Sequence, residues 1–202
     1  MRCLLALVLA AAACGGAAPH VDLRGTWPQQ VSDDYDDVTE RWTRTARMRS
    51  QYQEALELAA TFKSPEWRFA HAAKDAESRG LDGEAREQVF AQARAEDAGP
   101  YEFQLMVTTW DRRENDLDRG KKSVWRVRLL DEQSMEIEPL EILKDKRPGF
   151  VVRNQFPALG EFATPYIVRF PRTHPLLGPG IKQLRLRLSS ERGGVELSWL
   201  AP

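Results

Sequence analysis

The chain has 202 residues, of which 42% are hydrophobic and 29% are charged. This composition is typical of a globular protein and excludes a chain that is disordered throughout. Its 29 Lys and Arg residues are balanced by 30 Asp and Glu residues, and this balance gives no support for nucleic-acid binding.

The first residues of the chain predict export. A positive charge at Arg2 precedes an apolar run over residues 4–13, which has the length and polarity of a secretory signal and is too short to span a bilayer. Small residues then lead into Cys14 and Gly15. This segment resembles the lipobox of bacterial lipoproteins, in which the thiol of the corresponding cysteine accepts a diacylglycerol. Ala11 departs from that pattern, which commonly has Leu at this position.

The resemblance implies that residues 1–13 are a signal peptide and that Cys14 is the lipid attachment site. Acyl chains such as palmitate would then hold the protein permanently at a membrane. Gly15 in place of Asp implies sorting to the outer membrane, with the protein facing the periplasm. In the alternative, an ordinary cleavage site over residues 11–13 would be cut at the same bond and would release a soluble periplasmic or secreted protein.

The cysteine count fits the lipoprotein interpretation. Cys3 would leave with the signal and Cys14 would carry the lipid, and the chain has two cysteines in all. The folded part would therefore have no disulfide, thiol nucleophile or thiolate metal site. About 180 residues would remain, enough to bury a core without such covalent support.

The first half of the mature chain predicts a tether and then helices. Residues 14–32 are rich in Gly, Ala and Pro and predict a flexible tether. Over residues 33–62 apolar side chains recur every three or four positions, which predicts one long amphipathic helix that begins in an aspartate cluster. Ser64 and Pro65 predict the start of a second helix that ends at Gly80.

A third helix is predicted from Asp82 to the Gly99-Pro100 stop. After Pro100 the apolar period changes to two in several short segments. Strands are expected around residues 101–107, 125–129, 166–170, 184–188 and 195–199, with weaker candidates at 135–143 and 150–155. The alternation assigns one set of side chains to the interior, namely Trp125, Val127, Leu129, Leu184, Leu186, Leu188, Leu197 and Trp199, and four arginines to the outside, namely Arg126, Arg128, Arg185 and Arg187.

About seven strands in 100 residues are typical of a two-layer antiparallel β-sandwich. The predicted fold class is therefore α+β, with a helical region over residues 33–99 followed by a β-sandwich over residues 100–202. An immunoglobulin-like architecture is compatible with this pattern, although the segment has no cysteine pair that would mark that family.

Several clusters could carry chemistry, and each has a plainer interpretation that we favour. The aspartates at 33–37 and the loop over residues 111–120 lack the ligand spacing of a calcium loop, so we expect a helix cap and a solvated hairpin loop. His71 and Asp75 lie four residues apart, which is most often a surface pair. His174 has no identifiable partner. We therefore expect no metal, no cofactor and no catalytic site.

Two further features could form surfaces. Arg41, Arg44, Arg47 and Arg49 could meet anionic lipid, but acidic residues four positions earlier favour a solvated helix face. Leu176 and Leu177 lie in a loop stiffened by prolines. They are either a partner contact or a plug that closes one end of the core.

The functional hypothesis is a lipid-anchored protein of the cell envelope that acts as a non-catalytic binding or scaffold subunit. Its partners would be the membrane, through the lipid, and another envelope protein of unknown identity. A periplasmic carrier of a lipid or other apolar ligand is the alternative. A periplasmic hydrolase with a dispersed site is less favoured, because the chain has no GxSxG, Walker or GxGxxG motif.

Overall fold

The computed structural model describes residues 18–202 except for residues 32, 51–52 and 157–161. The export signal and Cys14 lie outside the described residues. None of the helices in the described part of the chain is both long and apolar enough to cross a bilayer.

The described chain folds into helices and two antiparallel sheets, so the predicted α+β class is confirmed. The helices are α1 (Tyr35–Trp42), α2 (Pro65–Ser78), α3 (Gly83–Asp97) and α4 (Gly149–Gln155), with short 3-10 helices η1 (Arg112–Glu114) and η2 (Leu117–Lys122). The first sheet has the order β1-β2-β3-β7-β6 and consists of β1 (Thr43–Ser50), β2 (Gln53–Phe62), β3 (Tyr101–Thr109), β7 (Thr164–Phe170) and β6 (Glu141–Lys144). The second sheet has the order β5-β4-β8-β9 and consists of β5 (Glu136–Ile137), β4 (Arg126–Leu130), β8 (Gln183–Ser190) and β9 (Gly193–Leu200).

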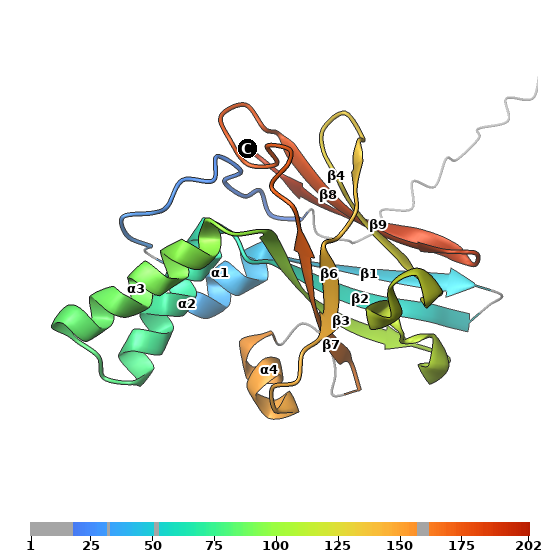
Figure 1. Ribbon diagram of the computed structural model, residues 1–202, viewed down its shortest axis with the longest axis horizontal. Helices are drawn as coiled ribbons and strands as arrows, with labels where there is room; N and C mark the ends of the chain where they lie inside the picture. Colours follow the sequence, from blue (N-terminus) through green and yellow to red (C-terminus); the bar gives the residue numbers. More distant parts are fainter. Residues whose placement is uncertain (1–17, 32, 51–52, 157–161) are drawn as a thin grey trace, which may run out of the picture.

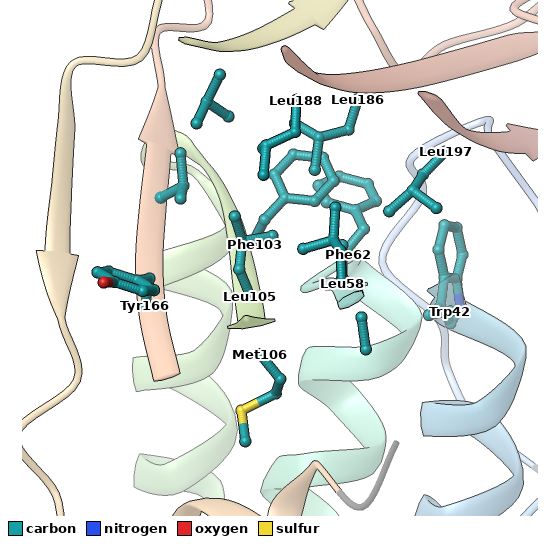
Figure 2. Packing of buried hydrophobic residues seen from close by; sticks show 14 of the residues in the cluster. Trp42, Leu58, Phe62, Phe103, Leu105, Met106, Tyr166, Leu186, Leu188 and Leu197 are labelled. Atoms are coloured by element: carbon teal, nitrogen blue, oxygen red, sulfur yellow. The ribbon is translucent and has the colours of Figure 1, made fainter. Parts of the chain in front are cut away.

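The core lies between the two sheets. Leu186, Leu188 and Leu197 of the second sheet point toward Phe62 and Phe103 of the first sheet (Figure 2). The rings of Phe62 and Phe103 stack with their centroids 4.7 Å apart. Burial of this apolar surface from both sheets supplies the main driving force for folding.

The predicted alternation of the β half is confirmed. The eight side chains assigned to the interior are each 3% exposed or less. The four arginines assigned to the outside are all exposed or half-buried. The prediction therefore placed each of these side chains on the correct face of its sheet. A shift of one residue would have exchanged the buried and exposed sets.

The start of the second helix is also confirmed. The Ser64 side chain accepts a hydrogen bond from the backbone N–H of Trp67, and Pro65 occupies the first turn of α2. Gly80 follows the helix with a positive φ of 61°, a backbone conformation that favours glycine. In α3, Asp82 occupies the N-cap position but makes no capping hydrogen bond with its side chain.

The long helix predicted over residues 33–62 is wrong. Asp34 does cap a helix, by accepting two backbone N–H groups of the first turn, but that helix ends at Trp42. The rest of the segment forms β1 and β2, which pair antiparallel. Thr43 and Thr45 are β-branched and favour extended backbone. On the core face of β2, buried apolar residues occupy every second position: Leu56, Leu58, Ala60 and Phe62.

This correction also changes the predicted domain organisation. Strand β2 pairs with β3, so one sheet extends across the boundary expected at residues 99–100. The region over residues 33–99 is a mixture of helices and strands. Helices α1, α2 and α3 gather at one end of the first sheet, whereas α4 lies on the side of that sheet opposite the second sheet (Figure 1).

The segment predicted as a tether is packed against the fold from about residue 19 onward. Val21 and Leu23 are buried in the core. The backbone N–H of Val21 donates to the carbonyl of Leu200 at 2.8 Å, and that of Gly178 donates to the carbonyl of Leu23 at 2.8 Å. The tether prediction rested on the Gly, Ala and Pro content and overlooked Val21 and Leu23, which alternate with polar residues. These two side chains anchor the segment to the core.

Three smaller predictions are corrected as well. Residues 150–155 form α4 rather than a strand. Residues 135–143 divide between β5 and β6, which belong to different sheets. The loop over residues 111–120 is not a hairpin, because β3 and β4 also belong to different sheets, and it contains η1 and η2.

Candidate functional site

Strand β3 presents its two faces to different surroundings. Phe103 lies in the core between the sheets, where its ring is 5.4 Å from that of Trp199. Glu102, Gln104 and Met106 alternate with the core residues and so project from the opposite face. Figure 2 shows Met106 pointing away from the leucines of the second sheet. Polar groups that are not part of the core therefore gather on this outer face of the first sheet.

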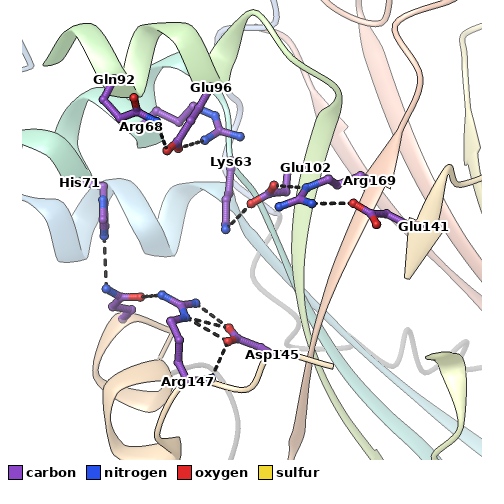
Figure 3. A network of polar contacts seen from close by, with 11 residues as sticks. Lys63, Arg68, His71, Gln92, Glu96, Glu102, Glu141, Asp145, Arg147 and Arg169 are labelled. Atoms are coloured by element: carbon purple, nitrogen blue, oxygen red, sulfur yellow. Dashed lines mark hydrogen bonds and ion pairs between the residues drawn. The ribbon is translucent and has the colours of Figure 1, made fainter. Parts of the chain in front are cut away.

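A ladder of alternating charges crosses one end of this outer face (Figure 3). Lys63 Nζ lies 2.5 Å from Glu102 Oε1, Arg169 Nε lies 2.7 Å from Glu102 Oε2, and Arg169 Nη1 lies 2.5 Å from Glu141 Oε1. Glu102 faces Arg169 in the β3–β7 register, and Arg169 faces Glu141 in the β7–β6 register. Opposite charges placed directly across neighbouring strands stabilise their pairing.

The inner end of the ladder is largely shielded from water. The side chains of Lys63 and Glu102 are 11% and 12% exposed. Burial lowers the pKa of Lys63 from its usual value, while the Glu102 charge opposes that shift. Burial alone would raise the pKa of Glu102, but the charges and hydrogen bonds of Lys63 and Arg169 outweigh it and lower this pKa to about 2. The ion pair joins Lys63, directly before α2, to Glu102 of β3, and so it holds the start of α2 against the sheet.

A second polar chain joins α2 to α4. Asp145 forms an ion pair with Arg147 at 2.6 Å, and Arg147 Nη1 donates to Oε1 of Gln155 at 2.6 Å. Nε2 of Gln155 lies 3.3 Å from Nε2 of His71. An amide nitrogen only donates, so the His71 nitrogen accepts and the ring is in its neutral form with the proton on Nδ1. Burial, together with the charge of Lys63, lowers the pKa of His71 to about 4.

Aromatic rings pack around this polar chain. His71 stacks on Trp67 with centroids 5.0 Å apart, and Trp67 stacks on Phe156 at 5.5 Å. The ammonium of Lys63 lies 5.7 Å from the Trp67 ring centroid. The polar groups are thus paired with one another and the rings are packed against them. We interpret this cluster as a structural contact that joins α2, α4 and the first sheet.

One buried polar group on the same face has no partner. Gln104 is fully buried, and in the described part of the chain neither atom of its amide makes a hydrogen bond. Its neighbours in register are Thr61 on β2 and Ile167 on β7. A buried amide without partners lowers the stability of the fold.

An open groove lies at the other end of the first sheet, where β3 and β6 end and β7 begins. Its volume is about 600 Å³. Trp110 and Phe162 line it, and these side chains are 68% and 75% exposed. The remaining described residues that line it are all polar or charged: Glu57, Thr108, Thr109, Arg112, Asn115, Lys144 and Thr164. We call this feature the Trp110 groove.

Hydrogen bonds fix the wall of the Trp110 groove. Nδ2 of Asn115 donates to the carbonyl of Val107 at 2.9 Å and to the hydroxyl of Thr164 at 3.1 Å. Oδ1 of Asn115 accepts from the Tyr166 hydroxyl at 2.9 Å. Asn115 therefore ties the loop after β3 to β7, and it holds the groove in a preformed shape.

The charges of the groove are unevenly paired. Glu57 accepts from Arg47 at 2.7 Å, so its charge is compensated. Lys144 Nζ lies 3.5 Å from Asp118, which is a long ion pair. Arg112 is exposed, and no ion pair is found for it among the described residues. The groove therefore offers cationic groups to a ligand.

The histidines singled out in the sequence do not form a site. His71 contacts Gln155 rather than Asp75, and Asp75 pairs with Arg79 at 2.9 Å. His174 Nδ1 lies 3.1 Å from the hydroxyl of its neighbour Thr173. Nowhere in the described ranges do three or more His, Cys, Asp or Glu side chains group in a way that could hold a metal ion.

The two loop leucines are not an exposed contact pair. Leu176 is 1% exposed and belongs to the core, and its backbone N–H donates to the Tyr101 hydroxyl at 3.2 Å. Leu177 is half-buried against the core. The prolines and glycines of the loop bend it back onto residues 18–31, so the leucines close one end of the fold.

Arg44 also differs from the sequence prediction. It lies on β1 rather than on a solvated helix face, and it is buried. Sequence reasoning did not find Trp110 or Phe162 either. The usable signal was an aromatic residue just outside a strand: Trp110 directly follows β3, and Phe162 lies two residues before β7.

Comparison of the chain with family models, curated proteins and solved structures found no match to any of them.

Proposed function

We propose that this protein is a non-catalytic ligand-binding protein of the bacterial cell envelope, attached to the periplasmic side of the outer membrane by lipid at Cys14, and that it binds its ligand in the Trp110 groove. The observation that carries the binding role is the pair of exposed aromatic side chains, Trp110 and Phe162, on a groove of about 600 Å³. Exposed aromatic surface beside a concave site is typical of binding surfaces.

The composition of the groove supports binding rather than hydrolysis. Glu57 is the single carboxylate among the described residues that line it, and Arg47 already compensates its charge. Glycoside hydrolysis in most families needs two carboxylates, and a hydrolase triad needs a base beside a nucleophile. The groove residues supply neither arrangement.

The composition also disfavours the carrier hypothesis. A site for a lipid tail is lined mainly by apolar side chains, whereas the Trp110 groove has no aliphatic residue among its described lining residues. The space between the two sheets is filled by their own side chains, as the contacts among Phe62, Phe103 and Trp199 illustrate.

The fold supports this role as a rigid frame. We propose that the two sheets are the layers of a β-sandwich of immunoglobulin-like architecture, with helices added at one end and on the outer face. In this arrangement the loop after β3 carries Trp110 at a strand end, where binding residues are commonly found on such scaffolds.

The anchor is tested with Cys14→Ala in the full chain. The variant should no longer incorporate labelled fatty acid and should leave the membrane fraction, while the same change at Cys3 should leave labelling intact, because the signal is removed. A Cys14→Ala protein that is still labelled contradicts the lipid anchor.

The binding role is tested by thermal unfolding of the purified protein with size-fractionated envelope extracts. A ligand at ten times its Kd adds about 1.4 kcal/mol of stability, which raises the Tm of a chain this size by about 3 to 6 °C. Trp110→Ala should abolish the shift. Phe150→Ala is the matched control, since Phe150 is 71% exposed and lies on α4. A shift that survives in Trp110→Ala, or a wild type that no fraction stabilises, contradicts the proposal.

A further inference from the structure

The side chains of the Trp110 groove define the chemistry of a ligand. Two flat aromatic rings, Trp110 and Phe162, are the apolar lining groups, and each has a negative face that attracts C–H groups. The other described lining residues carry hydroxyl, amide or charged groups. A ligand that stacks on the aromatic rings and also hydrogen-bonds to the polar groups needs flat C–H faces and many hydroxyl groups. A saccharide ring has both properties.

The charged side chains of the Trp110 groove favour one class of saccharide over others. Arg112 is exposed with no ion pair among the described residues, and Lys144 has only the long contact with Asp118 at 3.5 Å. Glu57 is paired with Arg47 and so contributes little negative charge. A guanidinium binds a carboxylate through two parallel hydrogen bonds, which gives the groove a preference for an anionic ligand.

The loop that carries Trp110 already has a fixed position in the free protein. Asn115 holds the loop of Trp110 against β7 through Thr164 and Tyr166. A ligand would therefore meet the groove without ordering this loop, which reduces the entropic cost of binding.

We infer that the Trp110 groove binds an acidic saccharide, with sugar rings on Trp110 and Phe162 and a carboxylate on Arg112 and Lys144. This inference rests on the proposed binding function and specifies its ligand class. Thr108 and Thr164 are placed to contact the sugar hydroxyls.

The test is a titration of the purified full chain, followed by tryptophan fluorescence and calorimetry, with a matched pair of probes. One probe is a hyaluronan hexasaccharide, which carries glucuronate carboxylates, and the other is the same hexasaccharide with those carboxyl groups reduced to alcohols. At low salt the acidic probe should bind at least tenfold more tightly than the reduced one. The difference should shrink as salt screens the exposed charges.

Variants separate the two parts of the inference. Trp110→Ala should weaken binding of both probes at least tenfold, and Phe150→Ala should leave both affinities unchanged. The double variant Arg112→Gln with Lys144→Gln should lower the affinity for the acidic probe to that for the reduced one. All of these positions are exposed, so the Tm of each variant without ligand should match that of the wild type.

Every other outcome overturns the inference. Equal affinity for the two probes would refute the acidic preference. Trp110-dependent binding of dodecanoate or of an acidic peptide, without binding of either hexasaccharide, would refute the saccharide class. If no probe binds while an envelope extract still raises the Tm through Trp110, the ligand class is wrong and the binding function stands. If the extracts fail too, both are wrong.

Discussion

The guanidinium of Arg44 lies over the indole ring of Trp199, with its Cζ atom 5.7 Å from the ring centroid. Its N–H groups donate to backbone carbonyls, including those of Pro19 at 2.6 Å, Arg41 at 2.8 Å and Ser198 at 2.8 Å. Burial lowers the pKa of Arg44 to about 10. One side chain thus joins the N-terminal segment, the end of α1 and the last strand.

Replacing Arg44 with Lys should destabilise the fold. A lysine keeps the charge but cannot present several donors in fixed directions, so buried carbonyls would be left without partners. We expect a loss of about 2 to 4 kcal/mol in the free energy of unfolding, measured by urea titration. Arg49→Lys, at an exposed position of β1, should change it by less than about 0.5 kcal/mol. Equal effects of the two changes would show that Arg44 has no special role.

Acid should weaken the fold through His71. Its pKa is lowered to about 4 in the folded protein, from 6.5. Between these values the unfolded chain binds a proton that the folded chain does not, so stability falls as the pH falls from 6.5 to 4. The full loss is roughly 3 kcal/mol.

His71→Phe isolates this contribution from the carboxylates that titrate in the same range. The variant keeps a ring that can pack on Trp67 but cannot bind a proton. The difference in stability between wild type and variant should therefore depend on pH between 6.5 and 4 and be constant above 7. A difference that does not change with pH contradicts the role of His71.

Gln104→Met should stabilise the protein. The buried amide of Gln104 has no hydrogen-bond partner in the described part of the chain, and Met has a similar length without the polar atoms to desolvate. We expect a gain of about 1 to 2 kcal/mol, seen as a higher urea midpoint. Thr61→Val, at the neighbouring position, removes a hydroxyl that bonds to Thr43 at 2.7 Å and should have the opposite sign. A destabilising Gln104→Met would mean that the amide has a partner in solution.

Leu176→Ala should be among the most damaging single changes in the loop region. Leu176 is fully buried, and truncating a buried leucine costs about 2 to 5 kcal/mol. Leu200→Ala is the comparison, because Leu200 is 37% exposed, and we expect a smaller loss. Thermal and urea unfolding of the two variants gives the answer. A nearly unchanged Leu176→Ala protein would contradict the closing role of this loop.

Sequence periodicity predicted the last hundred residues well because most of their strands have one buried face. Trp125, Val127 and Leu129 alternate with polar residues, and this pattern has one explanation. Strand β2 differs, because Ala59 lies on the outer face between Leu58 and Ala60 and is buried as they are. A strand buried on both faces lacks the alternation, so its residues also fitted a helical period.

The charge ladder and the Trp110 groove could not be predicted from the sequence for a different reason. Glu102, Arg169 and Glu141 are far apart in the chain, and the order of strands in the sheet brings them together. Trp110 and Phe162 likewise line one groove because β3 pairs with β7 in antiparallel register. Such encounters depend on strand order, which local patterns do not determine.

The bond between Val21 and Leu200 places the two ends of the described chain side by side. His20 Nδ1 also lies 2.8 Å from the carbonyl oxygen of Ala201, and Ala201 is in turn bonded to Lys182. A short linker could therefore join the ends, and the chain could be reopened at the exposed turn at Gly80. Such a circular permutant would keep every strand pairing of both sheets.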